Sequence, residues 1–348
     1  MDNIKVFYSK ILGKGSFSNV YKGIYKNTDV AVKIINTENL DGKIRQQMQR
    51  EIDVINILKK NKNKNIVEYY DIYEENDELF IAMELINGGE LSLEIKKGLE
   101  LSQVYDYYCQ ILGGYSHLLS LDIIHRDIKS ANILLSEDKK YIKICDFGLS
   151  KILGDNLNNT ICGSPLCMSP ELLNQQNYDT KSDIWSIGIL LYEMIYGFTP
   201  YHESSGLKTL KKNVFTKEIE YKKNSYLDKY DVSQNLISYL KKLLELNQYK
   251  RIEWDNLHDI DWFENNKEYV NIQNLKEFPN ISDTISSIMC SKPMDIKNNI
   301  TDKDIRDDIN LSDSINSLKN SPQIKSAPIT FSSVFTNVKN IVKNIISL

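Results

Sequence analysis

The chain has 348 residues, with 43 Lys and Arg against 47 Asp and Glu and a formal net charge of −4 at pH 7. This length fits one large domain with an extension and is ample for a buried hydrophobic core. The weakly acidic balance excludes an overall positive surface, so we expect no nucleic-acid partner.

The cysteine content and the lack of long apolar runs bear on the cellular location of the protein. The first residues, MDNIK, lack the apolar run of a signal peptide, and no later stretch approaches the ~18 apolar residues of a membrane span. The five cysteines are odd in number and have no paired metal-ligand spacing, so neither a disulfide framework nor a zinc site is expected. These features favour a reducing, cytoplasmic location.

The N-terminal third has the pattern of a small β-rich lobe. Residues 6–35 alternate apolar and polar positions around glycines, as paired strands do. Residues 66–86 have a similar strand-like composition. Between them, residues 45–60 predict one helix because apolar side chains recur at helical spacing.

The following part is mainly helical. Helical patterning occurs over residues 102–121, 180–196 and 232–246, and residues 133–145 interrupt it with a run that predicts a hairpin. A β-rich lobe followed by a helical lobe is an α+β arrangement, and the cleft between two such lobes is a favoured ligand site.

The composition changes again after residue 263. Residues 264–328 are rich in Asn, Asp, Ser and Lys, and we expect them to form a disordered linker. Residues 329–348 place apolar side chains at helical spacing, which predicts a C-terminal amphipathic helix. It could bind a partner, pack on the lobes or lie on a membrane surface. The membrane is least favoured because only Lys339 and Lys343 supply positive charge.

Polar residues that could take part in a reaction are concentrated in residues 125–132, HRDIKSAN, and in the DFG sequence at 146–148. The first stretch contains an acid, a cation and a carboxamide, and the second an acid beside a flexible glycine. Phosphoryl transfer needs such groups: a base for a hydroxyl proton, positive charge beside the phosphoryl group, and hard oxygen ligands for Mg²⁺.

These two motifs resemble the catalytic loop and the metal-binding motif of eukaryotic-type protein kinases, and the resemblance extends over residues 6–263. It implies a bilobal kinase fold with a β-rich N-lobe, a helical C-lobe and a C-terminal extension, using ATP and Mg²⁺ on protein substrates. By this resemblance Asp127 is the catalytic base, Lys129 neutralises the γ-phosphate, and Asn132 and Asp146 hold Mg²⁺. A lysine at position 129 is typical of Ser/Thr kinases.

The resemblance also assigns a nucleotide site in the N-terminal lobe. Gly13 and Gly15 match the phosphate-covering loop, although Ser18 replaces the third glycine and a hairpin turn is the alternative. Lys33 matches the lysine that holds the α- and β-phosphates, and Glu51 is its preferred partner over Asp53. A lysine at a strand edge with its charge in solvent is the alternative for Lys33. The residues expected around the adenine are Leu12, Val20, Ala31, Met83, Glu84, Ile86 and Leu134.

Residues 146–171 resemble an activation segment, and residues 160–165, TICGSP, are similar to that of the autophagy-initiating kinases and related Ser/Thr families. Thr160 matches a common phosphorylation site, and Arg126 offers a cation for its phosphate. An unmodified loop threonine is the alternative.

Other family positions are structural or depart from the pattern. His125 and Phe147 are expected to pack internally, Asp183 to bind the backbone near His125, and Arg251 to pair with Glu171. Ala131 replaces the acid of basophilic relatives, so strong selectivity for arginine is not expected. The competing hypothesis is a non-catalytic nucleotide-binding scaffold, supported only by Ser18 and Cys167.

Overall fold

The computed structural model describes residues 4–15, 18–38, 40–152, 164–176, 179–221 and 232–257. Its helices and strands are, in chain order, β1 (Ile4–Lys14), β2 (Ser18–Tyr25), β3 (Thr28–Asn36), α1 (Gly42–Lys60), β4 (Tyr69–Glu75), β5 (Glu78–Glu84), α2 (Leu91–Ile95), α3 (Leu101–Ser120), β6 (Ile123–Ile124), β7 (Ile133–Leu135), β8 (Ile142–Ile144), β9 (Lys151–Ile152), α4 (Pro170–Leu173), α5 (Thr180–Tyr196), α6 (Leu207–Thr216) and α7 (Gln234–Leu243). The predicted linker 264–328 and terminal helix 329–348 lie outside the described residues.

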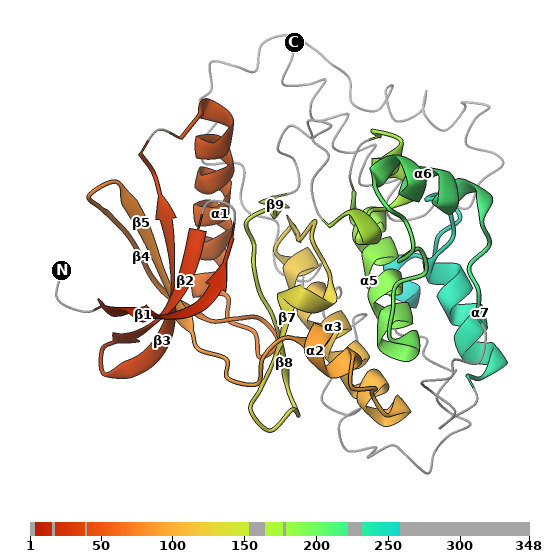
Figure 1. Ribbon diagram of the computed structural model, residues 1–348, viewed down its shortest axis with the longest axis horizontal. Coiled ribbons are helices and arrows are strands. Elements are labelled where there is room, and N and C mark those ends of the chain that lie inside the picture. Colours follow the sequence, from red (N-terminus) through yellow and green to blue (C-terminus); the bar gives the residue numbers. More distant parts are fainter. Residues whose placement is uncertain are drawn as a thin grey trace, which may run out of the picture. The chain divides into compact units, whose positions relative to one another are not determined.

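The first lobe is built on a five-stranded antiparallel sheet in the order β1-β2-β3-β5-β4. Strands β2 and β3 are joined at Lys26-Asn27, and β4 and β5 at Asn76-Asp77, and all four residues have positive φ. Two-residue turns of this hand match the right-handed twist of the strands. Figure 1 shows this sheet beside α1, separate from the helices of the second lobe.

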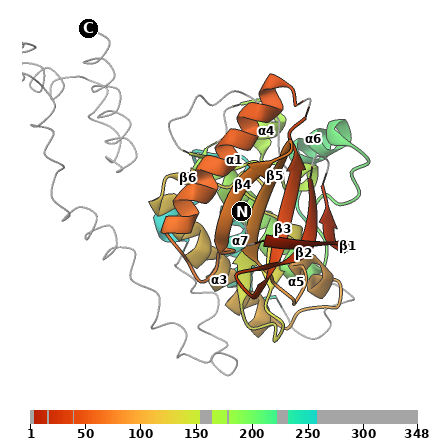
Figure 2. The ribbon, with the colours of Figure 1, turned by 90° about the vertical axis from the view of Figure 1, so that its left-hand side faces the viewer.

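Helix α1 covers one face of the sheet, as Figure 2 shows near β4 and β5. It begins earlier than the predicted residue 45 because Asp41 caps it, accepting a hydrogen bond from the Ile44 N–H at 2.8 Å. Its buried apolar side chains, Val54, Ile55 and Leu58, join the main core, and Glu51 on the same helix is also buried. The opposite sheet face has its own apolar cluster, formed by Val30, Val32, Ile34 and Phe80.

The second lobe is organised around α5, whose side chains are almost all buried. Helices α3 and α7 pack against it. A Cβ atom on Gly188 would lie 2.8 Å from Leu243 Cβ, so the glycine permits the close approach of α5 and α7. The predicted α+β arrangement of two lobes is thus confirmed. No helix among the described residues is both long and apolar enough to cross a membrane.

The predicted hairpin lies between the lobes and consists of β7 and β8, paired from Ile133↔Ile144 to Leu135↔Ile142. The chain that leaves β5 is tied to it, because the Gly88 N–H donates to the Leu135 carbonyl at 2.9 Å. A Cβ atom on Gly88 would lie only 2.1 Å from the Ser136 oxygen. Glycine therefore allows the interlobe linker to lie against the hairpin.

Candidate active site

Lys33 lies on the sheet face that packs toward α1. Its Nζ is 2.5 Å from Glu51 Oε1 and 3.5 Å from Asp146 Oδ1. Burial alone would lower the pKa of Lys33, but the carboxylates of Glu51 and Asp146 outweigh it and raise the pKa above its ordinary value. The structure therefore places Glu51 beside the lysine, whereas Asp53 accepts a hydrogen bond from Gln49 on the exposed side of α1.

Asp127 is buried and held on three sides. Its Oδ2 accepts from Lys129 Nζ at 2.7 Å and from Asn132 Nδ2 at 3.0 Å, and its Oδ1 accepts from the Ser164 N–H at 2.8 Å. A 3₁₀ turn over Ser130–Asn132 folds the loop back so that Lys129 and Asn132 flank the same carboxylate. A carboxylate fixed in this way can accept a proton from a hydroxyl placed beside it.

Asp183 of α5 binds the backbone at the start of the catalytic loop. This fully buried carboxylate accepts the backbone N–H groups of His125 at 3.0 Å and Arg126 at 3.1 Å, as the sequence predicts. It also accepts from Tyr115 Oη on α3 at 2.5 Å. Arg126 adopts a positive φ of 69°, a conformation that needs such support.

His125 and Phe147 pack together, as expected, and both are fully buried. Their ring centroids are 5.0 Å apart, and Phe147 makes an edge contact with Tyr69 of β4 at 6.1 Å. The His125 Nε2 lies 3.1 Å from the Cys145 carbonyl. This stack connects the catalytic loop to the sheet of the first lobe.

Asn132 and Asp146 are brought together by the β7–β8 hairpin. The pairing of Ile133 with Ile144 places Asn132 opposite Cys145, whose N–H donates to the Asn132 carbonyl at 3.0 Å. Asp146 is the next residue, and its side chain is half-exposed. Partial burial would raise the pKa of Asp146, but Lys33, and secondarily His125, lower it below its ordinary value, so the carboxylate is anionic.

These two side chains fit Mg²⁺. The Asn132 Nδ2 donates to Asp127, which turns its Oδ1 away from that carboxylate. An amide oxygen and an anionic carboxylate are hard ligands, and Mg²⁺ commonly takes its remaining ligands from water and phosphate. The described residues contain no group of three or more His, Cys, Asp and Glu side chains that could bind a metal by itself.

The side chains expected above the nucleotide share the sheet face of Lys33. Val20 pairs with Lys33 across β2 and β3, and Ala31 pairs with Met83 across β3 and β5. Gly13 pairs in turn with Val20, which places the glycine loop at the same end of the sheet.

The remaining predicted nucleotide contacts are more dispersed. Leu134 lies on β7 and is half-buried, and Ile86 is half-buried after β5. The Glu84 N–H donates to the Glu68 carbonyl at 2.8 Å, so of the two Glu84 backbone groups only the carbonyl could form a hydrogen bond with a purine. Leu12 on β1 is 50% exposed. The Gly15 N–H donates to the Ser18 carbonyl at 2.7 Å and closes the loop as a turn.

The activation segment is described only at its two ends. Thr160 lies outside the described residues. At the far end, Arg251 binds Glu171 through two hydrogen bonds of 2.8 and 3.0 Å, as predicted. Cys167 is buried, and burial raises the pKa of its thiol to about 12. A thiol with this pKa is protonated near neutral pH and a poor nucleophile.

Two residues that the sequence did not single out contact this site. Tyr69 extends the stack of His125 and Phe147, and Gln47 of α1 donates to the Gly148 carbonyl at 2.9 Å. A tyrosine in a strand and a glutamine on an exposed helix face carry no distinctive signal in a single sequence.

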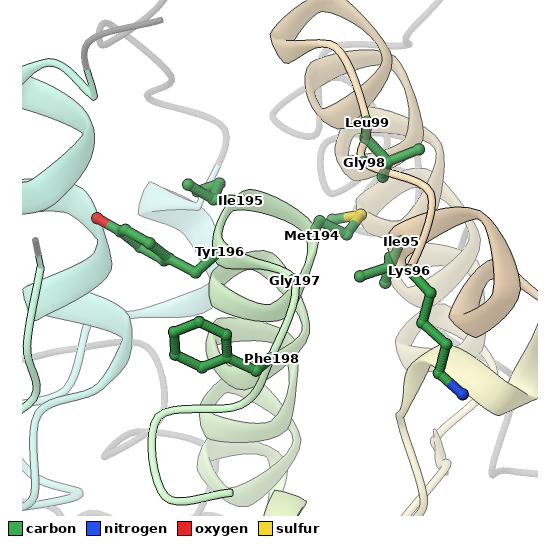
Figure 3. A pocket seen from close by; sticks show the side chains of 9 residues that line it. All are labelled: Ile95, Lys96, Gly98, Leu99, Met194, Ile195, Tyr196, Gly197 and Phe198. Atoms are coloured by element: carbon green, nitrogen blue, oxygen red, sulfur yellow. The ribbon is translucent and has the colours of Figure 1, made fainter. Parts of the chain in front are cut away.

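A separate apolar cavity of about 300 Å³ lies between the end of α2 and the end of α5. In Figure 3 the side chain of Met194 points toward Ile95, whereas Tyr196 and Phe198 point away from them. The residues that line this cavity include none of those predicted to bind the nucleotide or the metal.

Comparisons with known proteins agree with this geometry. The family model described as protein kinase domain matches residues 7–263. The chain is 36% identical over 272 residues to the serine/threonine-protein kinase atg1 of Dictyostelium discoideum, covering 75% of this chain and 40% of that protein. It is 32% identical to the CBL-interacting serine/threonine-protein kinase 10 of Arabidopsis thaliana, covering 73% and 52%. It is 31% identical to myosin light chain kinase A of Dictyostelium discoideum, covering 77% and 91%. The chain therefore spans about half the length of the first two relatives.

Proposed function

Because this chain belongs to the protein kinase domain family, we propose that it transfers the γ-phosphate of ATP to Ser and Thr hydroxyls of protein substrates. The observation that carries the proposal is the double contact of Lys33, at 2.5 Å to Glu51 and 3.5 Å to Asp146. This double contact joins Lys33, helix α1 through Glu51, and Asp146 in one arrangement. Such an arrangement supports a catalytic role over a scaffold role.

Asp127 would take the proton of the acceptor hydroxyl. Its carboxylate is oriented by Lys129 and Asn132 on one oxygen and by the Ser164 N–H on the other. Such orientation matters because the protein's main contributions to phosphoryl transfer are positioning and electrostatic stabilisation. The ammonium of Lys129, which lies beside Asp127 Oδ2, would offset the charge of the transferring γ-phosphoryl group.

Lys33 would hold the α- and β-phosphates while Glu51 holds Lys33. Asn132 and Asp146 would hold Mg²⁺, which neutralises phosphate charge when it is bound. The Lys33–Asp146 contact keeps the side chain proposed to bind phosphate next to the one proposed to bind the metal.

The acceptor and the control of the enzyme are finer parts of the proposal. Lys129 supports Ser and Thr as acceptors, because the resemblance to Ser/Thr kinases includes this position. Phosphorylation of Thr160, with Arg126 as the cation that binds it, would order the activation segment. A cytoplasmic location is supported by the cysteine content of the chain.

The full chain, purified and given labelled ATP with Mg²⁺, should phosphorylate a generic Ser/Thr substrate protein or itself. Asp127→Asn should reduce this rate by about 10²–10⁴-fold, because the amide cannot accept the hydroxyl proton. Nucleotide binding, followed by thermal stabilisation, should persist in the variant. Equal labelling by the two proteins would contradict the proposal.

The scaffold hypothesis makes the opposite prediction for the wild-type chain. ATP would stabilise the protein against heat, but no phosphate would be transferred to any protein. Mass-spectrometric mapping of the incorporated phosphate separates the finer parts of the proposal: phosphotyrosine would contradict the Ser/Thr assignment, and an unmodified Thr160 in active protein would contradict its regulatory role.

A further inference from the structure

A side chain of α1 binds the start of the activation segment. The Gln47 Nε2 donates to the Gly148 carbonyl at 2.9 Å. Gln47 lies four positions before Glu51, so the two side chains project from the same face of α1. The helix that presents Glu51 to Lys33 therefore also holds Gly148.

Gly148 lies directly against the buried ion pair. A Cβ atom on Gly148 would be 3.4 Å from Glu51 Oε2 and 3.7 Å from Lys33 Nζ. Its N–H donates to Asp146 Oδ1 at 3.4 Å, and that same oxygen is 3.5 Å from Lys33 Nζ. These contacts form a closed set. Lys33 binds Glu51, and Glu51 lies on the same helix as Gln47. Gln47 binds Gly148, and both Gly148 and Lys33 contact Asp146.

The residues that follow Gly148 are bound to the catalytic loop as well, and β9 also contacts α1. Ser150 Oγ donates to the His125 carbonyl at 3.1 Å, and β9 pairs with β6 immediately before that loop. Of the hydrogen bonds described for residues 146–150, those of Lys33 and Gln47 connect the segment to β3 and α1.

We propose that Gln47 is a positioning residue that couples α1 to residues 146–148, so that the Lys33–Glu51 pair and the metal-binding Asp146 are assembled in one state. The proposal rests on the kinase activity proposed above and adds a residue to it. Gln47 itself would touch neither nucleotide nor substrate. Because Gln47 is exposed, water competes for its hydrogen bond, and the expected effect of losing it is a fall of about 2- to 10-fold in kcat.

Three substitutions at this position separate the hydrogen bond from other effects. Gln47→Leu removes the donor, and Gln47→Glu keeps the size but places an anionic acceptor beside the Gly148 carbonyl. Gln47→Arg supplies N–H donors on a side chain that is long enough to reach that carbonyl. The matched control is Gln49→Leu, because the Gln49 amide donates to Asp53 within α1 at 2.9 Å and leaves Gly148 untouched.

The kinetic test measures kcat and the KM for ATP on the full chain, with the phosphorylation state matched by mass spectrometry, and Tm on the same samples. We expect kcat to fall in the Leu and Glu variants, to recover in the Arg variant and to stay at the wild-type value in Gln49→Leu, with Tm unchanged throughout. Wild-type kcat in Gln47→Leu would overturn the proposal. A fall that tracks Tm, or that occurs equally in Gln49→Leu, would show a merely structural role.

A second measurement does not depend on activity. Hydrogen–deuterium exchange should speed up at the backbone amides of residues 147–150 in Gln47→Leu and remain unchanged in Gln49→Leu. Unchanged exchange in Gln47→Leu would overturn the coupling even in a chain that transferred no phosphate. An inactive wild-type chain with altered exchange would instead contradict the proposed function alone.

Discussion

At the scale of single residues, two cations in the described part of the chain are held by carboxylates inside the fold. Lys33 is held by Glu51 and Asp146, and Arg251 binds Glu171 in the second lobe. Removing a charge from water is costly, and a partner with good geometry offsets the cost. Breaking such a pair is therefore more damaging than its net contribution to stability suggests, because the remaining charge stays buried.

Replacing Glu51 with Gln should weaken the hold on Lys33. The amide keeps an acceptor but loses the charge, and a hydrogen bond to a charged group contributes about 1.5–3 kcal/mol, so kcat/KM for ATP should fall about 10- to 150-fold. Steady-state kinetics measure the change. Asp53→Asn is the matched control, because Asp53 lies on the exposed side of the same helix; a loss of equal size there would contradict the assignment.

Acid should destabilise the Glu171–Arg251 pair. Burial would raise the pKa of Glu171, but Arg251 lowers it below the ordinary value of 4.5. A carboxyl group whose pKa is lowered by folding contributes stability above its unfolded pKa and loses it as the pH falls through the folded pKa. Urea unfolding from pH 6 to pH 4 and below should therefore show a decline that is smaller in Glu171→Gln. An identical decline in both proteins would show that Glu171 does not contribute to it.

At the scale of elements, the active site depends on how closely helices and strands approach one another. The β7–β8 register places Asn132 beside Asp146, and the 3₁₀ turn over Ser130–Asn132 folds Lys129 back onto Asp127. Helix α5 supports the loop through Asp183 and is held in turn by its packing on α7. A change in the packing of α5 should therefore reach the catalytic loop.

Gly188→Ala tests this packing. The added Cβ would meet Leu243 Cβ at 2.8 Å and Leu244 Cδ2 at 2.9 Å, and overpacking of this kind costs about 1–3 kcal/mol. We expect a lower free energy of unfolding in urea. Gly42→Ala is the control, since a Cβ at the start of α1 meets no atom within 4 Å. Equal stability of Gly188→Ala and wild type would show that α5 and α7 can separate without cost.

At the scale of the whole molecule, the site joins side chains from two lobes. Lys33 and Glu51 come from the sheet and α1, whereas Asp127, Asn132 and Asp146 come from the loop and hairpin of the second part. A ligand that contacts both groups would bind the folded arrangement and not the unfolded chain. Binding of that kind stabilises a protein by mass action.

A non-hydrolysable ATP analogue with Mg²⁺ should raise the Tm of the full chain. At a ligand concentration 100 times the Kd, the stabilisation would be about 2.7 kcal/mol. Chelation of Mg²⁺ should remove part of the shift, because Asn132 and Asp146 then have no cation to share with the phosphates. In Asp146→Asn the shift should no longer depend on Mg²⁺. A shift that still depends on Mg²⁺ in that variant would argue against Asp146 as a ligand.

Several expectations from the sequence failed at element boundaries. Helix α1 begins at Gly42, earlier than predicted, because the apolar pattern starts after the Asp41 cap. Helix α2 was not predicted, and α6 (Leu207–Thr216) lies in the part expected to be mainly helical but was given no range of its own. Helix α2 is very short, and α6 buries only Leu210, Asn213 and Val214. Such elements depend on packing more than on their own pattern.

The sequence by itself determined the class of the protein, because local motifs fix which chemical groups are present and in what order along the chain. Residues 125–132 and 146–148 sufficed to identify the kinase fold and to nominate Asp127, Lys129, Asn132 and Asp146. The tertiary structure decided the contacts that no sequence motif implies. Gln47 and Gly148 are 101 positions apart, and Tyr69 of β4 is also far in the sequence from Phe147. An exposed amide or a strand tyrosine acquires its role from the neighbour that folding brings to it.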